Sequence, residues 1–149
     1  MADGIVIRAV GRDERAAWEP LWKGYLDFYK TTVPREVYET TWVRLHDPDE
    51  PMGLLGAYVD GRLCGIVHYL YHRSCWTIGN YCYLQDLFVT ADARKRGIGR
   101  ALIEAVCKEA RAAGASRVHW LTHETNATAR ALYDTLADRP GFIQYRKLF

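Results

Sequence analysis

Apolar residues recur along the chain with two different periods, and these periods predict strands and helices in a definite order. A short apolar run at Ile5–Ala9 predicts an opening strand. Two aromatic-rich segments follow, with apolar residues spaced three and four apart as on one face of a helix. Asp13 stands where it can cap the first helix, and Pro20 can kink or restart that helix. The apolar positions of the two helices are Trp18, Leu21, Trp22, Tyr25, Leu26 and Tyr29, then Tyr38, Trp42 and Leu45.

An acidic, proline-containing turn at residues 47–51 ends the helical part and is followed by extended runs. Runs 54–59 and 63–71 are joined through Asp60-Gly61, a strong signal for a tight hairpin. Gly65 within the second run predicts a bulge or a close approach of another backbone. These features predict an antiparallel meander.

A third extended run, at 83–89, leads through a basic loop into an amphipathic helix that ends near Gly114. The next run, 117–122, completes a strand, loop, helix, strand unit, which predicts a right-handed crossover between parallel strands. Thr125 or Asn126 can cap a short further helix, and residues 142–148 predict a final strand. We therefore expect one α/β domain with a mixed sheet over residues 1–149.

The composition argues against several classes of protein but does not identify a function. The 149 residues are 49% hydrophobic and carry a net charge of +2, and no segment approaches the length of a membrane span. The polar start lacks the apolar region of a signal peptide, so we expect a cytoplasmic protein. The modest net charge argues against a nucleic-acid-binding module in spite of the local basic cluster.

Metal binding is not expected either. The four cysteines show no C-x-x-C spacing and stand among apolar neighbours, as reduced and mostly buried thiols do. Cys64, His68 and His72 would share one face of a strand, but each lies roughly 13 Å from the next, too far for one zinc ion.

The basic loop has the wrong charge for the start of a helix. Four cations, Arg94, Lys95, Arg96 and Arg100, surround a helix N-terminus, where the partial positive charge favours acids. No Ser, Thr, Asp or Asn stands in the capping position. Free N–H donors, glycines and guanidinium groups together predict a site for a polyanion such as pyrophosphate. The loop is neither a Walker motif nor a dinucleotide fingerprint, because its glycine spacing and flanking residues differ from both.

At these residues the chain resembles the GNAT superfamily of acetyl-coenzyme A-dependent N-acetyltransferases. The pyrophosphate motif of that family is Gln or Arg, two residues, Gly, any residue, then Gly or Ala, here Arg94, Gly97 and Gly99. A second motif, Asn126-x-x-Ala129-x-x-Leu132-Tyr133, follows in the expected order, so the resemblance spans nearly the whole chain. The run at 83–89 and the upstream aromatic residues look most like the branch of histone, polyamine and small-amine acetyltransferases.

The resemblance implies how the residues divide the work. Loop backbone N–H groups would hold the pyrophosphate of acetyl-coenzyme A, the strand edge would pair with the pantetheine arm, and Asn126 would contact that arm. Strands 83–89 and 117–122 would splay apart to leave a gap for the acetyl group and the amine. The expected cofactor-binding residues are Leu87, Phe88, Val89, Arg94, Lys95, Arg96, Gly97, Ile98, Gly99, Arg100, Ala101, Asn126 and Ala129.

Three residues are candidates for proton transfer. The resemblance implies that Tyr133 stands near the sulfur as the general acid, although its place beside Leu132 also suits a core ring. Gln85 occupies a position that is commonly a proton-relaying Glu in related polyamine acetyltransferases, and an amide cannot act as a base. Asp86 points to the opposite face of a regular strand, so both could line one pocket only with a bulge; a buried structural carboxylate that accepts backbone N–H bonds is the favoured reading.

The acceptor and the base stay open at this point. His119, His123, Glu124 or an ordered water are further candidates for the base. The acceptor class includes polyamines, amino acids, small amines, aminated antibiotics and protein lysines, and a homodimer is plausible. A non-catalytic acyl-coenzyme A sensor is the alternative function, kept open by Gln85.

Overall fold

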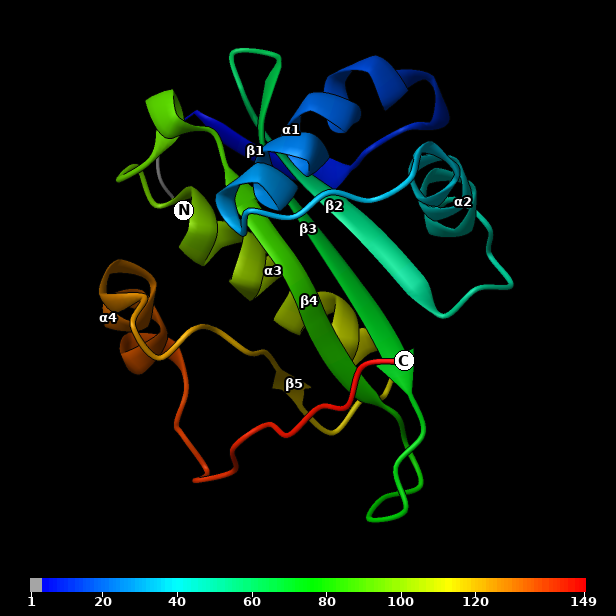
Figure 1. Ribbon diagram of the computed structural model, residues 1–149, viewed down its shortest axis with the longest axis vertical. Coiled ribbons are helices and arrows are strands. Elements are labelled where there is room, and N and C mark those ends of the chain that lie inside the picture. The colour runs from blue at the N-terminus through cyan, green and yellow to red at the C-terminus, as the bar shows by residue number, and fades with distance from the viewer. Residues whose placement is uncertain (1–3) are drawn as a thin grey trace.

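Five strands form one mixed sheet with helices on both of its faces in the structure, a computed structural model that describes residues 4–149 (Figure 1). Residues 1–3, part of the polar start discussed above, lie outside the described residues. Neighbouring strands follow sequence order, with β1 to β4 antiparallel and β5 parallel to β4. The elements are β1 Ile5–Ala9, α1 Arg15–Phe28, α2 Arg35–Leu45, β2 Met52–Val59, β3 Arg62–His72, β4 Tyr81–Val89, α3 Ile98–Ala112, β5 Val118–His119 and α4 Ala127–Leu136. None of the helices in this range is long and apolar enough to cross a bilayer.

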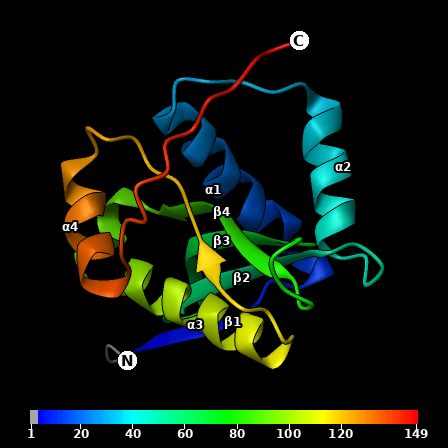
Figure 2. The same ribbon diagram turned by 90° about the horizontal axis from the view of Figure 1, so that it is seen from below.

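The sheet separates two apolar clusters, one under each helical layer (Figure 2). Helices α1 and α2 cover one face with an aromatic-rich cluster centred on the fully buried Trp18. Helix α3 covers the other face, and its apolar stripe includes Ile98, Leu102 and Val106, as the three- and four-residue spacing predicts. The aromatic residues of the first two helices therefore pack on the sheet, as expected from their spacing.

The meander forms as its turn chemistry predicts. Asp60 and Gly61 both have positive φ, 50° and 77°, which a two-residue hairpin loop of this kind requires. The bulge expected at Gly65 falls on its neighbour, because Ala57 pairs with Gly65 and Tyr58 with Leu63. Gly65 itself allows a close approach: a Cβ there would lie 3.0 Å from Ile98 Cγ2 of α3.

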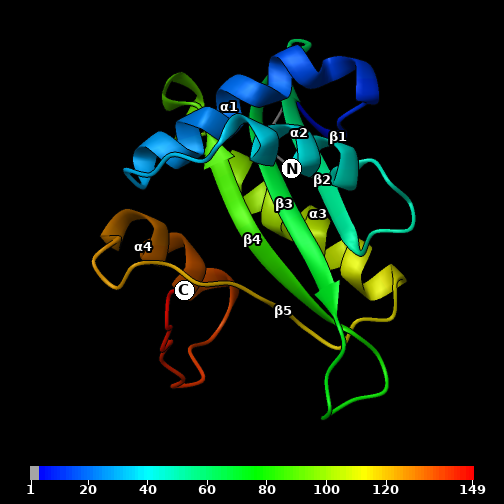
Figure 3. The ribbon, with the colours of Figure 1, turned by 45° about the vertical axis from the view of Figure 1, so that its right-hand side comes forward.

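Strand β4 contains a second bulge, and it separates the strand from β5. His68 pairs with Asp86 and Tyr69 with Leu84, so Gln85 is the extra residue. Pairing between β4 and β5 is limited to Cys82 with Val118 and Tyr83 with His119, both before the bulge. Beyond the bulge the chain that follows β5 diverges from β4 toward α4 (Figure 3). The splayed strands expected from the sequence are therefore present.

One expectation about the start of a helix is wrong. Asp13 does not cap α1; a short 3₁₀ turn at Arg12–Glu14 precedes the helix, and the Glu14 carboxylate accepts the Gly11 N–H at 2.9 Å instead. Pro20 lies inside α1, which continues through it. A side chain that accepts a backbone N–H of its own turn can stabilise the start of a helix without a cap at the predicted position.

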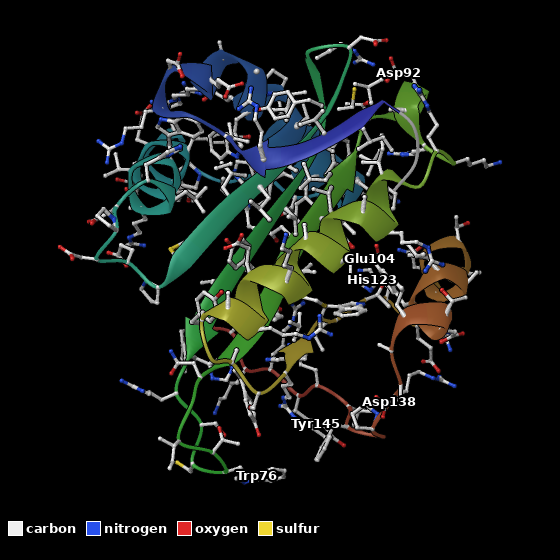
Figure 4. The ribbon with its side chains drawn as sticks, turned by 180° about the vertical axis from the view of Figure 1, so that it is seen from behind. Trp76, Asp92, Glu104, His123, Asp138 and Tyr145 are labelled. Carbon is white, nitrogen blue, oxygen red and sulfur yellow. The ribbon has the colours of Figure 1, made fainter. Side chains whose placement is uncertain are left out.

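Of the last two predicted strands, one is shorter in the structure and the other is absent from the described residues. The strand predicted at 117–122 is confined to Val118–His119, because β4 turns away at its bulge and leaves the following residues without a ladder partner. The strand predicted at 142–148 does not form: these residues have no regular structure, and Phe142 and Tyr145 are 79% and 88% exposed. Figure 4 shows Tyr145 projecting toward the same end of the molecule as Trp76 of the β3–β4 loop. The neighbouring edge, β5, is only two residues long and offers little backbone for another strand to pair with.

Candidate functional site

The loop before α3 presents an uncapped helix N-terminus. Gly97 occupies the N-cap with a left-handed backbone, φ 82°, and makes no side-chain cap. Lys95 also has positive φ, 65°, so the chain turns sharply twice before the helix begins at Ile98. No acid stands in the first turn, and the first N–H groups of a helix have no intrahelical acceptor. The free backbone N–H groups at the helix N-terminus therefore point out of the helix, toward the space in front of the loop.

The four cations of the loop divide into two kinds. Arg94 folds back on β4, with Nε donating to the Val89 carbonyl at 3.1 Å and its guanidinium 5.7 Å from the centre of the Phe88 ring. Arg100 reaches α4, donating to Thr135 Oγ1 at 2.9 Å. Lys95 and Arg96 are exposed at the tip of the loop. Two cations therefore fix the loop against its neighbours, and two are left at its surface to attract an anion.

One edge of β4 is open next to this loop. On its β3 side β4 is paired from Tyr81 to Val89, but on its β5 side the pairing stops at Tyr83. The backbone groups after the bulge, at Leu87, Phe88 and Val89, therefore face the gap without a strand partner on that side. An extended ligand arm can add to such an edge as another strand would.

Helix α4 closes the far side of the gap and carries Tyr133. Asn126 caps this helix, accepting the Ala129 N–H at 3.4 Å and donating to Thr122 Oγ1 at 3.4 Å, as one of the two expected caps. Tyr133 is half-buried, with its ring 5.5 Å from that of Trp120. Burial and then the nearby Tyr29 phenol raise the pKa of Tyr133, so the hydroxyl stays protonated at neutral pH. Tyr133 is therefore both packed and available as a proton donor.

The bulge gives Gln85 and Asp86 different surroundings. Gln85 is exposed at the open edge, whereas Asp86 is 7% exposed and faces α1. The expected burial of Asp86 is correct, but the expected partners are wrong: its carboxylate accepts from the His68 side chain, Nδ1 to Oδ2 3.0 Å, and not from backbone N–H groups. His68 in turn accepts the Trp18 indole N–H at 3.0 Å.

Tyrosine side chains surround the Asp86 carboxylate. Burial, the charge of Asp86 and a hydrogen bond to it raise the pKa of Tyr25, and burial followed by the charge of Asp86 raises the pKa of Tyr29 and of Tyr83. The Tyr29 phenol also acts on Tyr133. Tyr29 is thus electrostatically coupled to both groups, and its ring lies 4.9 Å from that of Tyr25.

The other candidate bases, His123, His119 and Glu124, differ in their neighbours. The exposed His123 has its ring 5.5 Å from that of Tyr29, so it stands at the rim of the same site. His119 stacks on Tyr83 at 5.1 Å and lies beside His72; burial, Arg117 and His72 lower its pKa. Glu124 is exposed, and its backbone carbonyl accepts from Arg130.

His68 is the residue that the sequence did not single out for this site. Its only sequence signal is a polar side chain inside the apolar run of β3. The described residues contain no group of three or more metal-ligating side chains. All four cysteines are free, with Cys64 and Cys82 buried.

Comparisons with known proteins agree with this geometry. The model of the acetyltransferase (GNAT) family matches residues 17–137. The chain is 37% identical to the D-amino-acid N-acetyltransferase HPA3 of Saccharomyces cerevisiae over 147 residues, 97% of this chain and 91% of the relative. It is 31% identical over 80 residues to the thialysine N-epsilon-acetyltransferase of Caenorhabditis elegans, 54% of this chain and 49% of that one. Among solved structures, the aminoglycoside N-acetyltransferase AAC(6')-Iy in complex with CoA superposes with a TM-score of 0.79 at 20% identity, covering 96% of this chain and 94% of that chain.

The residues present fit acetyl-coenzyme A. A helix N-terminus without a cap or an acid, turned by Gly97 and flanked by exposed cations, matches the charge and donor requirements of a pyrophosphate. The open edge of β4 lies beside that loop and matches an extended amide-containing arm. On these grounds and on the match of the family model to most of its length, the chain belongs to the GNAT family of acetyl-coenzyme A-dependent N-acetyltransferases.

Proposed function

We propose that this enzyme transfers an acetyl group from acetyl-coenzyme A to the primary amine of a small molecule, an amino acid or a related amine. The observation that carries the proposal is the gap where β4 and β5 part, which lies between the open edge of β4, the uncapped loop before α3 and helix α4 with Tyr133. A relative named for D-amino acids, aligned over 97% of this chain, supports the amino-acid class. The burial of the Asp86 carboxylate supports a small acceptor over a protein lysine.

The cofactor-binding part comprises the loop and the open strand edge. The backbone N–H groups of residues 97–100 and the exposed Lys95 and Arg96 hold the pyrophosphate, while Leu87, Phe88 and Val89 pair with the pantetheine arm. Asn126 and Ala129 form the start of α4 on the other side of the gap. When bound, acetyl-coenzyme A supplies an activated thioester carbonyl.

Tyr133 is the general acid. Its half-buried phenol keeps its proton at neutral pH and can donate a hydrogen bond where negative charge develops on a departing sulfur. The Trp120 ring packs against it edge-on and holds its orientation. Gln85 stands at the same gap and can orient an amine by hydrogen bonds, but its amide cannot take the proton.

Thiol release from acetyl-coenzyme A tests the proposal. The purified protein is incubated with D-amino acids, thialysine, L-ornithine, spermidine and a lysine-containing peptide, and free thiol and acetylated product are both measured. We expect turnover with at least one small amine and none with the peptide. Binding of acetyl-coenzyme A without turnover on any amine would contradict the proposal and favour a sensor of acyl-coenzyme A. Preference for the peptide would contradict the small-acceptor class.

A further inference from the structure

The buried chain Trp18, His68 and Asp86 connects the aromatic core under α1 to the candidate site. Trp18 is fully buried, and His68 and Asp86 are 4% and 7% exposed. The three residues come from three elements, α1, β3 and β4, and are joined by two hydrogen bonds of 3.0 Å each. Such a chain places a polar path through a face that is otherwise packed with aromatic rings.

The donor chemistry of Trp18 fixes the state of His68. An indole N–H can only donate, so His68 Nε2 must accept with its lone pair. The ring proton then sits on Nδ1 and is donated to Asp86 Oδ2. Protonation of Nε2 would set two donors against each other, so the Trp18 contact holds His68 neutral.

A neutral His68 leaves the Asp86 carboxylate without a balancing charge. Within residues 4–149, His68 is the one basic side chain at ion-pair distance from it. A buried carboxylate needs hydrogen bonds and a counter-charge to remain ionised at low cost. A hydrogen bond is supplied by His68, whereas no counter-charge is supplied within residues 4–149.

The surroundings of Asp86 suit a small cation. The charge of Asp86 acts on Tyr25 of α1, on Tyr29 at the C-cap of α1 and on Tyr83 of β4. The rings of Tyr25 and Tyr29 lie 4.9 Å apart, and the His123 ring is 5.5 Å from that of Tyr29. Aromatic faces attract an ammonium group that a carboxylate neutralises. Tyr29 also connects this place to Tyr133.

We propose that His68 is a positioning residue, held neutral by Trp18, which fixes the ionised Asp86 carboxylate as the counter-charge for the ammonium group of the acceptor. This inference rests on the proposed amine acetylation and adds the residues that select a cationic acceptor. It also explains why a histidine and an aspartate are buried together beside an aromatic-lined site.

Three variants separate positioning from a merely structural role. Asp86→Asn keeps the size and shape of the side chain and removes its charge. His68→Gln places an amide near the position of Nε2, which keeps the Trp18 bond and removes the donor to Asp86. His68→Asn places an amide near the position of Nδ1, which keeps the donor to Asp86 and removes the Trp18 bond. The last two therefore form a matched pair at one position.

The readouts are the KM for L-ornithine, D-alanine and spermidine, kcat, the melting temperature, and calorimetric binding of the same amines to the protein–coenzyme A complex. We expect Asp86→Asn and His68→Gln to raise amine KM and Kd about 10- to 100-fold, the range for a lost hydrogen bond to a charged group. The affinity for coenzyme A is expected to stay the same. His68→Asn is expected to recover most of the amine affinity that His68→Gln loses.

Several results would overturn the inference. One is a wild-type protein that binds none of the three amines. Another is an unchanged amine KM in Asp86→Asn, which would contradict the role of Asp86 even if His68→Gln does not fold. Equal losses in His68→Asn and His68→Gln would show a structural role alone. Amine binding in calorimetry without any thiol release would instead count against the proposed acetylation and leave the cation site standing.

Discussion

Replacement of Gly97 by Ala tests the loop that turns into α3. Gly97 has φ 82°, and an L-residue in the left-handed region costs roughly 1–2 kcal/mol. For a chain of this length each kcal/mol lowers the melting temperature by about 2–4 °C, so Gly97→Ala is expected to lower it by about 2–8 °C. The same strain rotates the N–H groups away from the pyrophosphate, and a loss of about 1.4 kcal/mol in their contacts weakens binding tenfold.

Gly99→Ala is the matched control, two residues further on. Its φ is not positive, and an added Cβ would meet Leu132 Cδ2 of α4 at 3.5 Å, an ordinary contact. In a helix Ala is more favourable than Gly by up to about 1 kcal/mol, so the melting temperature should stay the same or rise. Thermal unfolding with and without coenzyme A, together with calorimetry, measures both quantities. Equal stability and equal coenzyme A affinity in the two variants would refute the reasoning.

Three further variants address catalysis and stability. Tyr133→Phe is expected to lower kcat about 100-fold with unchanged coenzyme A affinity, as loss of a general acid does; an unchanged kcat in steady-state assays would remove Tyr133 from that role. Gln85→Glu places a carboxylate at the exposed bulge and is expected to raise kcat/KM at neutral pH; no gain would show that the proton already leaves by another route. Hydrogen bonds from Arg8 and the Gly11 N–H lower the pKa of Glu14 to about 2 from 4.5, so its contribution to stability is present above pH 4.5 and lost as the pH falls toward 2. Glu14→Gln should flatten the fall of the melting temperature in that window, and an unchanged slope would contradict the assignment.

Local physical chemistry accounts for what the sequence predicted well. The positive-φ hairpin at Asp60-Gly61, the uncapped N-terminus at Gly97 and the Asn126 cap each depend on residues that are close together in the chain. Helical periodicity likewise identified the buried stripe of α3. The loop geometry expected of a cofactor site could therefore be predicted.

Long-range pairing accounts for what the sequence missed. The bulge at Gln85 depends on the register between β3 and β4, and the partner of Asp86 stands 18 residues away on the other strand. Residues 142–148 are rich in apolar and aromatic side chains, but whether a strand forms depends on the edge beside it, and β5 is two residues long. The carboxylate that accepts the Gly11 N–H belongs to Glu14 and not to Asp13, because Glu14 is also held by hydrogen bonds from Arg8 and Tyr58. The local sequence does not reveal these tertiary contacts.

Gln85 is one extra residue in β4, and the pairing of β4 with β5 stops just before it. The edge of β4 beyond this bulge therefore has no strand partner on the β5 side. Backbone amides just beyond the bulge are therefore protected on the β3 side only, and their exchange with deuterium should report directly on occupancy of the gap. A bound cofactor arm would slow exchange on the open side of residues 85–89 and leave the β2–β3 ladder unchanged. Deletion of Gln85 would restore the regular alternation of β4, extend its pairing with β5 and abolish the gap, so that a better-formed sheet would be an inactive enzyme.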